Sequence, residues 1–171
     1  GKKLADTWTA LHRGDAEPLP TDKDLLEAWR LYHAGDFAGA VTLAGKVGLA
    51  AHAVANKASG IYADYLEEDE ERKTEIYRAG IERAEQAIAE RPDDANAHYF
   101  HAFLLGRYSQ SISIAKALAR GIGGKVRESL DNALALAPEH AEAYSALGLY
   151  YVEIINKVGR IVGKLTYGAS A

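Results

Sequence analysis

The chain has no cysteine and no methionine among its 171 residues, and only four prolines. The absence of cysteine excludes disulfides and thiolate chemistry but leaves the cellular compartment open. No apolar run approaches the ~18 residues of a membrane-spanning helix, and the N-terminus lacks the apolar core of a signal peptide. Because a removed signal leaves no trace, localisation stays unknown: the cytoplasm is favoured, and the periplasm is the alternative.

The composition is that of an ordinary globular protein, with 48% hydrophobic and 26% charged residues. We expect residues 1–20 to form an N-terminal arm that ends near Pro18, and residues 21–171 to form one helical domain. Thr21 or Asp22 is a plausible N-cap for a helix over 25–33. Without methionine, and with glycine at position 1, we expect a piece of a longer protein that is truncated at the C-terminus.

Two segments of the chain, 87–98 and 133–144, carry the same pattern 46 residues apart. In each, an amphipathic helix runs into a proline (Pro92 or Pro138), two polar residues follow, and a new helix begins on small residues. Turns of this kind separate the helices in proteins built from stacked helix hairpins. A weaker third copy lies over 28–44. The sequence therefore predicts an all-α protein.

The second copy resembles the tetratricopeptide repeat (TPR) family. Tyr144, Leu147, Gly148 and Tyr151 stand at the family's Trp, Leu-Gly and Tyr positions, and Gly148 is expected at a close helix contact. Small or apolar residues also stand at the packing positions of the preceding helices, namely Gly80, Ala84, Ala87, Leu130 and Ala133. The resemblance implies antiparallel hairpins stacked as a right-handed solenoid, a scaffold for binding other molecules.

The 46-residue spacing exceeds the ~34 residues of an ordinary repeat. We expect the extra residues to extend the first helix of the repeat through 106–120, until the glycines of 121–124 end it. The apolar positions after Tyr151 predict a second long first helix. Its stripe from Tyr150 to Leu165 would be exposed unless missing residues or a second subunit cover it.

Charge is distributed unevenly. The first hundred residues carry 12 basic and 19 acidic side chains, and the remainder carry 8 and 5. The acidic run 64–71 fits a solvated turn before a helix over 73–90, whose N-terminus favours negative charge. Net charge −4 and short basic segments argue against a nucleic-acid partner.

Catalytic and metal motifs are weak, and we expect a non-enzymatic protein without cofactors. His98 and His101 share a helix face, as a metal pair would, but stand at packing positions of the repeat. Gly121 to Val126 resembles a phosphate loop only superficially, although Lys125 could help to hold an anion at a helix start. Ser129 and Ser145 have no adjacent base in the sequence.

The expected binding site is a groove lined by the long first helices, and it suits an acidic peptide or a terminal carboxylate. We therefore predict a scaffold that binds a protein or peptide. One alternative is a pocket around His101, Arg107 and Tyr108 for an anionic or amphipathic metabolite; another is self-assembly through the C-terminal apolar face. The candidate groove residues are His101, Arg107, Tyr108, Gln110, Ser111, Lys125, Asn156 and Arg160.

The C-terminal part, 97–170, has a closer resemblance. Its long first helices, its glycine-rich break and the segment from Arg160 to Ser170 are similar to the regulator-of-microtubule-dynamics-like TPR family and to the T component of TRAP transporters. The first resemblance implies microtubule or membrane-contact roles, and the second a role beside a solute-binding protein. Neither family supplies a set of catalytic residues.

Overall fold

The computed structural model describes residues 2–159, and all regular structure within that range is helical. A short 3₁₀ turn, Leu49–Ala51, precedes α4. No helix in this part of the chain is both long and apolar enough to cross a membrane. The α-helices are α1 (Lys2–Leu11), α2 (Lys23–His33), α3 (Phe37–Val47), α4 (His52–Tyr65), α5 (Glu70–Glu90), α6 (Ala95–Gln110), α7 (Ile114–Ala119), α8 (Ile122–Leu136) and α9 (Ala141–Val158).

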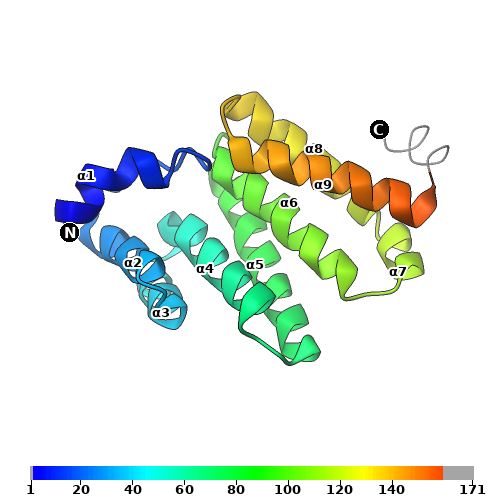
Figure 1. Cartoon of the computed structure of the whole chain (residues 1–171), viewed down its shortest axis with the longest axis horizontal. Helices are drawn as coiled ribbons and strands as arrows, with labels where there is room; N and C mark the ends of the chain where they lie inside the picture. Colours follow the sequence, from blue (N-terminus) through cyan, green and yellow to red (C-terminus); the bar gives the residue numbers. More distant parts are fainter. Residues whose placement is uncertain (1, 160–171) are drawn as a thin grey trace.

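From α2 onwards, each long helix packs against the next long helix in the chain, and the small helix α7 lies against α8 (Figure 1). Helices α2, α4, α6 and α9 also contact one another in that order. They therefore form one row, with α3, α5 and α8 packed against it as the second helices of successive hairpins. The expected all-α fold class is confirmed.

Aspartate side chains cap the N-termini of four of the described helices. Asp22 accepts a hydrogen bond from the Leu25 backbone N–H at 2.8 Å, so the expected cap is confirmed. Asp36, Asp69 and Asp94 cap α3, α5 and α6 in the same way. Each cap satisfies a backbone donor that the helix itself leaves free. The acidic run supplies the cap and first turn of α5, which begins at Glu70, three residues earlier than expected.

Small residues allow the hairpins to pack closely, as the repeat pattern predicts. Ala84 and Ala87 on α5 and Ala133 on α8 are fully buried. A Cβ on Gly80 would lie 2.6 Å from a methyl carbon of Leu104, and one on Gly60 would lie 2.7 Å from the Phe103 ring. Neither position has room for a side chain without displacing a neighbour.

Gly148 does not lie at such a contact, and the prediction that it does is wrong. The residue is exposed, and nothing lies within 4 Å of the place where its Cβ would be. No described helix covers this side of α9, where Tyr144, Leu149 and Val152 are exposed. Tyr150, the first residue of the expected exposed stripe, is instead buried, and the part of the stripe from 160 onwards lies outside the described residues.

The expected long first helix over 97–120 is also interrupted. Helix α6 ends at Gln110, and α7 begins after Ser113, whose hydroxyl accepts a hydrogen bond from the Lys116 N–H. Ser111 donates its hydroxyl to the Tyr108 carbonyl at 2.8 Å. Serines that bond the backbone in this way compete with helix continuation. A helix break does occur at Gly121, which has φ +62°. The other glycines of 121–124 do not extend the break, because α8 begins at Ile122.

Residues 2–20 contain a helix that is anchored to the core. Trp8 on α1 is buried, with its ring stacked on His12 and edge-on to Trp29 of α2 at 5.8 Å. Its indole N–H donates to the Glu17 carbonyl at 2.8 Å. The segment after α1 then runs toward the start of α6 (Figure 1). The N-terminal residues thus span several hairpins of the stack.

Candidate functional site

Two open depressions meet on the surface of α6, and together we call them the α6 groove. One, of about 320 Å³, lies between α6 and α9 and includes Tyr99, Phe103 and Leu149 in its lining. The other, of about 290 Å³, extends toward the end of α4 and the start of α5. Arg107 and Gln110 line both depressions. The groove therefore has an apolar half and a polar half, joined at α6.

Arg107 is held in place by two interactions. Its Nε atom lies 2.9 Å from a carboxylate oxygen of Asp64, and its guanidinium lies over the Phe103 ring at 5.4 Å. Asp64 also accepts a hydrogen bond from the Tyr77 hydroxyl at 2.8 Å. Burial and this carboxylate raise the pKa of Tyr77. Arg107 thus presents an oriented cation to the groove, part of whose charge Asp64 already balances.

The other predicted groove residues on α6 have separate roles. Gln110 and Ser111 are exposed and line the polar half together with Arg107. Tyr108 is buried, and its hydroxyl accepts a hydrogen bond from Arg120 at 2.6 Å. It therefore contributes to the packing below the groove instead of its surface.

His101 faces away from the groove, toward α8. Its Nδ1 lies 2.7 Å from the Ser129 hydroxyl, and its Nε2 lies 3.5 Å from a carboxylate oxygen of Glu85. Burial lowers the pKa of His101. Neither His101 nor Tyr108 lines the groove. These two side chains and Arg107 therefore do not together line the metabolite pocket that the sequence offered as an alternative.

The structure gives Ser129 an adjacent base, contrary to the sequence-based expectation. A carboxylate, an imidazole and a hydroxyl in line are the parts of a nucleophilic triad. Ser129 is only 5% exposed, however, and lies between α6 and α8. A substrate cannot reach its Oγ in this arrangement. Ser129 and His101 are hydrogen-bonded, and Glu85 adds an ion-pair contact to the same ring, so the three side chains form a polar seam. Sequence reasoning missed it because the residues come from three different helices.

The remaining candidates are apart from the α6 groove. Lys125 on α8 and Asn156 on α9 are exposed and do not line it. Arg160 lies outside the described residues. His98, the other half of the suspected metal pair, has its Nε2 2.9 Å from the Pro92 carbonyl. Within residues 2–159, no cluster of three or more histidine or acidic side chains could hold a metal ion.

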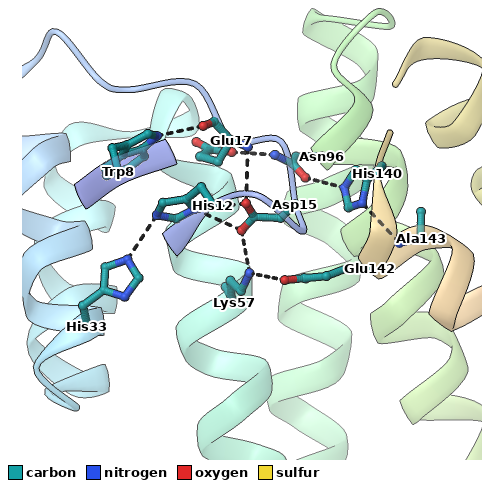
Figure 2. Close-up of polar contacts among 10 residues, drawn as sticks. All are labelled: Trp8, His12, Asp15, Glu17, His33, Lys57, Asn96, His140, Glu142 and Ala143. Atoms are coloured by element: carbon teal, nitrogen blue, oxygen red, sulfur yellow. Dashed lines mark hydrogen bonds and ion pairs between the residues drawn. The ribbon is translucent and has the colours of Figure 1, made fainter. Parts of the chain in front are cut away.

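A buried polar network joins the N-terminal segment to α4 and α9 (Figure 2). Lys57 of α4 donates to Asp15 at 2.5 Å and to Glu142 of α9 at 2.8 Å. His12 Nδ1 lies 3.0 Å from the same Asp15 carboxylate. Burial would raise the pKa of Asp15, but the hydrogen bonds and charges of His12 and Lys57 hold it far below its ordinary range.

Glu17 is the second acidic residue of this network. Its carboxylate accepts a hydrogen bond from the Asn96 amide at 2.6 Å, and His140 in turn lies 2.9 Å from the Asn96 carbonyl oxygen (Figure 2). Burial, together with the negative charges of Asp15 and Asp94, raises the pKa of Glu17 to about 8. Glu17 is therefore mostly protonated at neutral pH.

Glu17 and Asp15 also line a cleft of about 610 Å³, which we call the acidic cleft. One wall is the segment from Asp15 to Asp22, and the opposite wall is the turn between α5 and α6, from Arg91 to Asn96. The sequence gives no sign of this cleft, because its walls are separated by about seventy positions and approach only when α1 folds back over the stack.

Comparison with known proteins identifies one family. The family model of regulator of microtubule dynamics protein 1-3 matches residues 47–158, about two thirds of the chain. The match runs from the end of α3 through α9, and so includes the α6 groove, Lys57 and Glu142. Searches of the curated proteins and of the solved structures gave no significant match. The chain belongs to the regulator of microtubule dynamics protein 1-3 family.

Proposed function

We propose that this protein is a non-enzymatic, TPR-like scaffold that binds a protein or peptide through the α6 groove. The observation that carries the proposal is the meeting of an apolar and a polar depression at Arg107 and Gln110. A surface of this kind suits a segment that buries an apolar side chain and also hydrogen-bonds its backbone or a carboxylate. The proposal includes a TPR-type solenoid architecture and a partner-binding role similar to that of the T component of TRAP transporters.

The apolar half supplies the anchor. Leu149 is 65% exposed in the unbound chain, beside the rings of Phe103 and Tyr99 in the groove lining. Side chains of a partner that cover such residues gain roughly 25 cal/mol for each Å² of apolar surface removed from water. The polar half then determines the orientation of the bound segment, because Asp64 and Phe103 already hold the Arg107 guanidinium in one position. Pre-oriented groups lose less entropy on binding.

The partner is identified by site-directed crosslinking. A photoreactive residue replaces Gln110, which is exposed in the groove, and in a control chain it replaces Glu82, exposed on α5. Under the proposal, lysate from the native host gives a specific crosslink from position 110 only. Polymerised tubulin is a separate arm of the experiment, because the family name connects its members with microtubule dynamics.

The affinity of the captured partner is then measured with matched variants. Leu149→Ser and Arg107→Gln should each weaken binding at least fivefold. Leu136→Ser removes another exposed leucine, which lies at the end of α8 outside the groove, and should have no effect. Equal weakening by all three variants, or by none, would contradict the groove.

Self-assembly is a second candidate, and the uncovered side of α9 favours it. Tyr144, Leu149 and Val152 are all more than half exposed there. Sedimentation over a wide concentration range tests it: Val152→Asp should abolish an oligomer, while Leu136→Asp should not. A chain that stays monomeric at all concentrations removes this candidate.

A further inference from the structure

Helix α1 is attached to the stack by few side chains. Trp8 is buried, Leu4 and Ala5 are half-buried, and the other described side chains of this helix are exposed. A helix that buries so little apolar surface opens at a lower free-energy cost than the core of the stack. The polar contacts next to Trp8 therefore help to determine whether α1 stays packed on α2.

His12, directly after α1, is hydrogen-bonded on both sides of its ring (Figure 2). It is only 3% exposed, and its Nδ1 lies 3.0 Å from the Asp15 carboxylate. Its Nε2 lies 3.1 Å from Nε2 of His33, which is exposed on α2. Asp15 is ionised and can only accept, because its pKa lies far below the ordinary range, so Nδ1 of His12 carries a proton. The contact between the two Nε2 atoms then holds with one proton between them, donated by either ring.

A second proton removes this hydrogen bond. When both rings are cations, each Nε2 carries an N–H, so neither can accept from the other, and the two like charges repel. A charged His12 still has the Asp15 carboxylate as its counter-charge, whereas His33 has no ion pair with another described residue. His33 is therefore the ring that takes up the second proton.

The groups around His33 disfavour its cation at neutral pH. Partial burial lowers the pKa of His33, and the positive charges of His12 and Lys57 lower it further, against an opposing effect of Asp15. Tyr32, whose ring lies 5.1 Å away, has its pKa raised by burial and stays neutral in acid. The pair therefore keeps its hydrogen bond at neutral pH and loses it when the solution becomes acidic.

We propose that the His12–His33 pair is a pH-sensitive switch, in which protonation of His33 in mildly acidic solution releases α1 from α2 and exposes Trp8. The proposal is independent of the α6 groove. The Lys57–Asp15 ion pair remains, because the pKa of Asp15 is so low that its carboxylate stays ionised in mild acid. The residues that follow α1 therefore keep their place, and only α1 moves.

Hydrogen–deuterium exchange of the whole chain tests the proposal, measured by mass spectrometry at pH 7.0 and pH 5.0 and corrected for the intrinsic effect of pH on exchange. Protection of residues 3–11 should fall about tenfold or more at pH 5.0, because one proton shifts an equilibrium by up to about tenfold per pH unit. Protection of α5 should be the same at both pH values. Glu17 does not account for the change, since its pKa of about 8 keeps it mostly protonated at both.

His33→Gln keeps a side-chain N–H that can donate to His12 but cannot take up a proton. In this variant, α1 should be protected at pH 5.0 to within about twofold of its protection at pH 7.0. Asp24→Asn is the matched control, because it removes an exposed titrating group from the same helix, and it should respond to pH as the unaltered chain does. In the unaltered chain, the His33 ring observed by NMR should titrate with the same midpoint as the loss of α1 protection.

Several results would overturn the proposal. One is protection of α1 that is absent at pH 7.0 or unchanged at pH 5.0. Another is an equal loss of protection in His33→Gln and in the unaltered chain, or a His33 titration whose midpoint differs from that of the loss by more than about one pH unit. Loss of protection in α5 together with α1 would show that acid unfolds the whole stack instead of releasing one helix.

Discussion

Lys57 and Asp15 form a buried ion pair between positions 42 residues apart, with Nζ 2.5 Å from the carboxylate. Asp15 is 1% exposed and Lys57 14% exposed. Removing one partner of such a pair leaves the other charge buried without compensation. The pair is therefore one of the contacts that hold the N-terminal segment against α4.

Lys57→Met should lower the free energy of unfolding by about 3–5 kcal/mol, because Asp15 loses its main cation. Urea denaturation measures the change. The double variant Asp15→Asn/Lys57→Met should recover part of the loss, since no charge is then left buried. Lys46→Met, at an exposed position of α3, serves as the control and should stay within about 0.5 kcal/mol of the unaltered chain. A loss in the double variant equal to or larger than that in Lys57→Met would contradict the explanation.

Glu17 should make the protein less stable as pH rises. Its pKa is raised from 4.5 to about 8 on folding, so the folded chain holds this proton more tightly than the unfolded chain. The stabilisation is complete below about pH 4.5 and is lost as pH approaches 8. The dependence is at most about 1.4 kcal/mol per pH unit.

Glu17→Gln isolates that effect, because every other titrating group is shared with the unaltered chain. Between pH 5.5 and 7.5, the unaltered chain should lose up to about 2 kcal/mol of stability relative to the variant. Urea denaturation at several pH values provides the two curves. Parallel curves would show that Glu17 has an ordinary pKa in the folded protein.

Gly80→Ala and Gly148→Ala should change stability in opposite directions. At Gly80, the new methyl would lie 2.6 Å from a methyl carbon of the fully buried Leu104 and 3.3 Å from the Asn56 side chain, so these neighbours must shift and we expect a loss of about 1–3 kcal/mol. At Gly148, the space is open and the position is helical, so alanine should gain about 0.5–1 kcal/mol. Thermal denaturation distinguishes them. A loss at both positions would indicate that α9 is covered on its outer side.

Ser129→Ala should cost about 1–3 kcal/mol, because it leaves Nδ1 of His101 buried without its partner. Ser145→Ala is the matched control, since its hydroxyl bonds only to the Ala141 carbonyl at an exposed position. It should change stability by less than about 0.5 kcal/mol. Equal effects of the two substitutions in chemical denaturation would remove the seam as a stabilising element.

Local signals in the sequence predicted local structure well. The Asp22 cap is a contact between neighbours in the chain, and the burial of Ala84 and Ala133 follows from their helical spacing. The break between α6 and α7 was missed because Ser111 and Ser113 can either continue a helix or end it, and only their hydrogen bonds decide.

The candidate sites were predictable only in part. Arg107, Gln110 and Ser111 share the end of one helix, so their common surface follows from periodicity. The acidic cleft depends instead on where the segment after α1 crosses the stack. Asn96 meets Glu17 across 79 positions, and no spacing rule relates such residues. At Gly148 the sequence predicted a close helix contact that the structure lacks, because a residue can occupy a motif position without a neighbouring helix beside it.

The link from Asp15 through Lys57 to Glu142 has a consequence for how the chain unfolds. A stack in which each hairpin touches only its neighbours can fray from either end, one hairpin at a time. Here the N-terminal segment binds both α4 in the middle and the start of α9, so loss of either end breaks a contact of the other. We expect the described helices to unfold together, with similar hydrogen-exchange protection in α2 and α9.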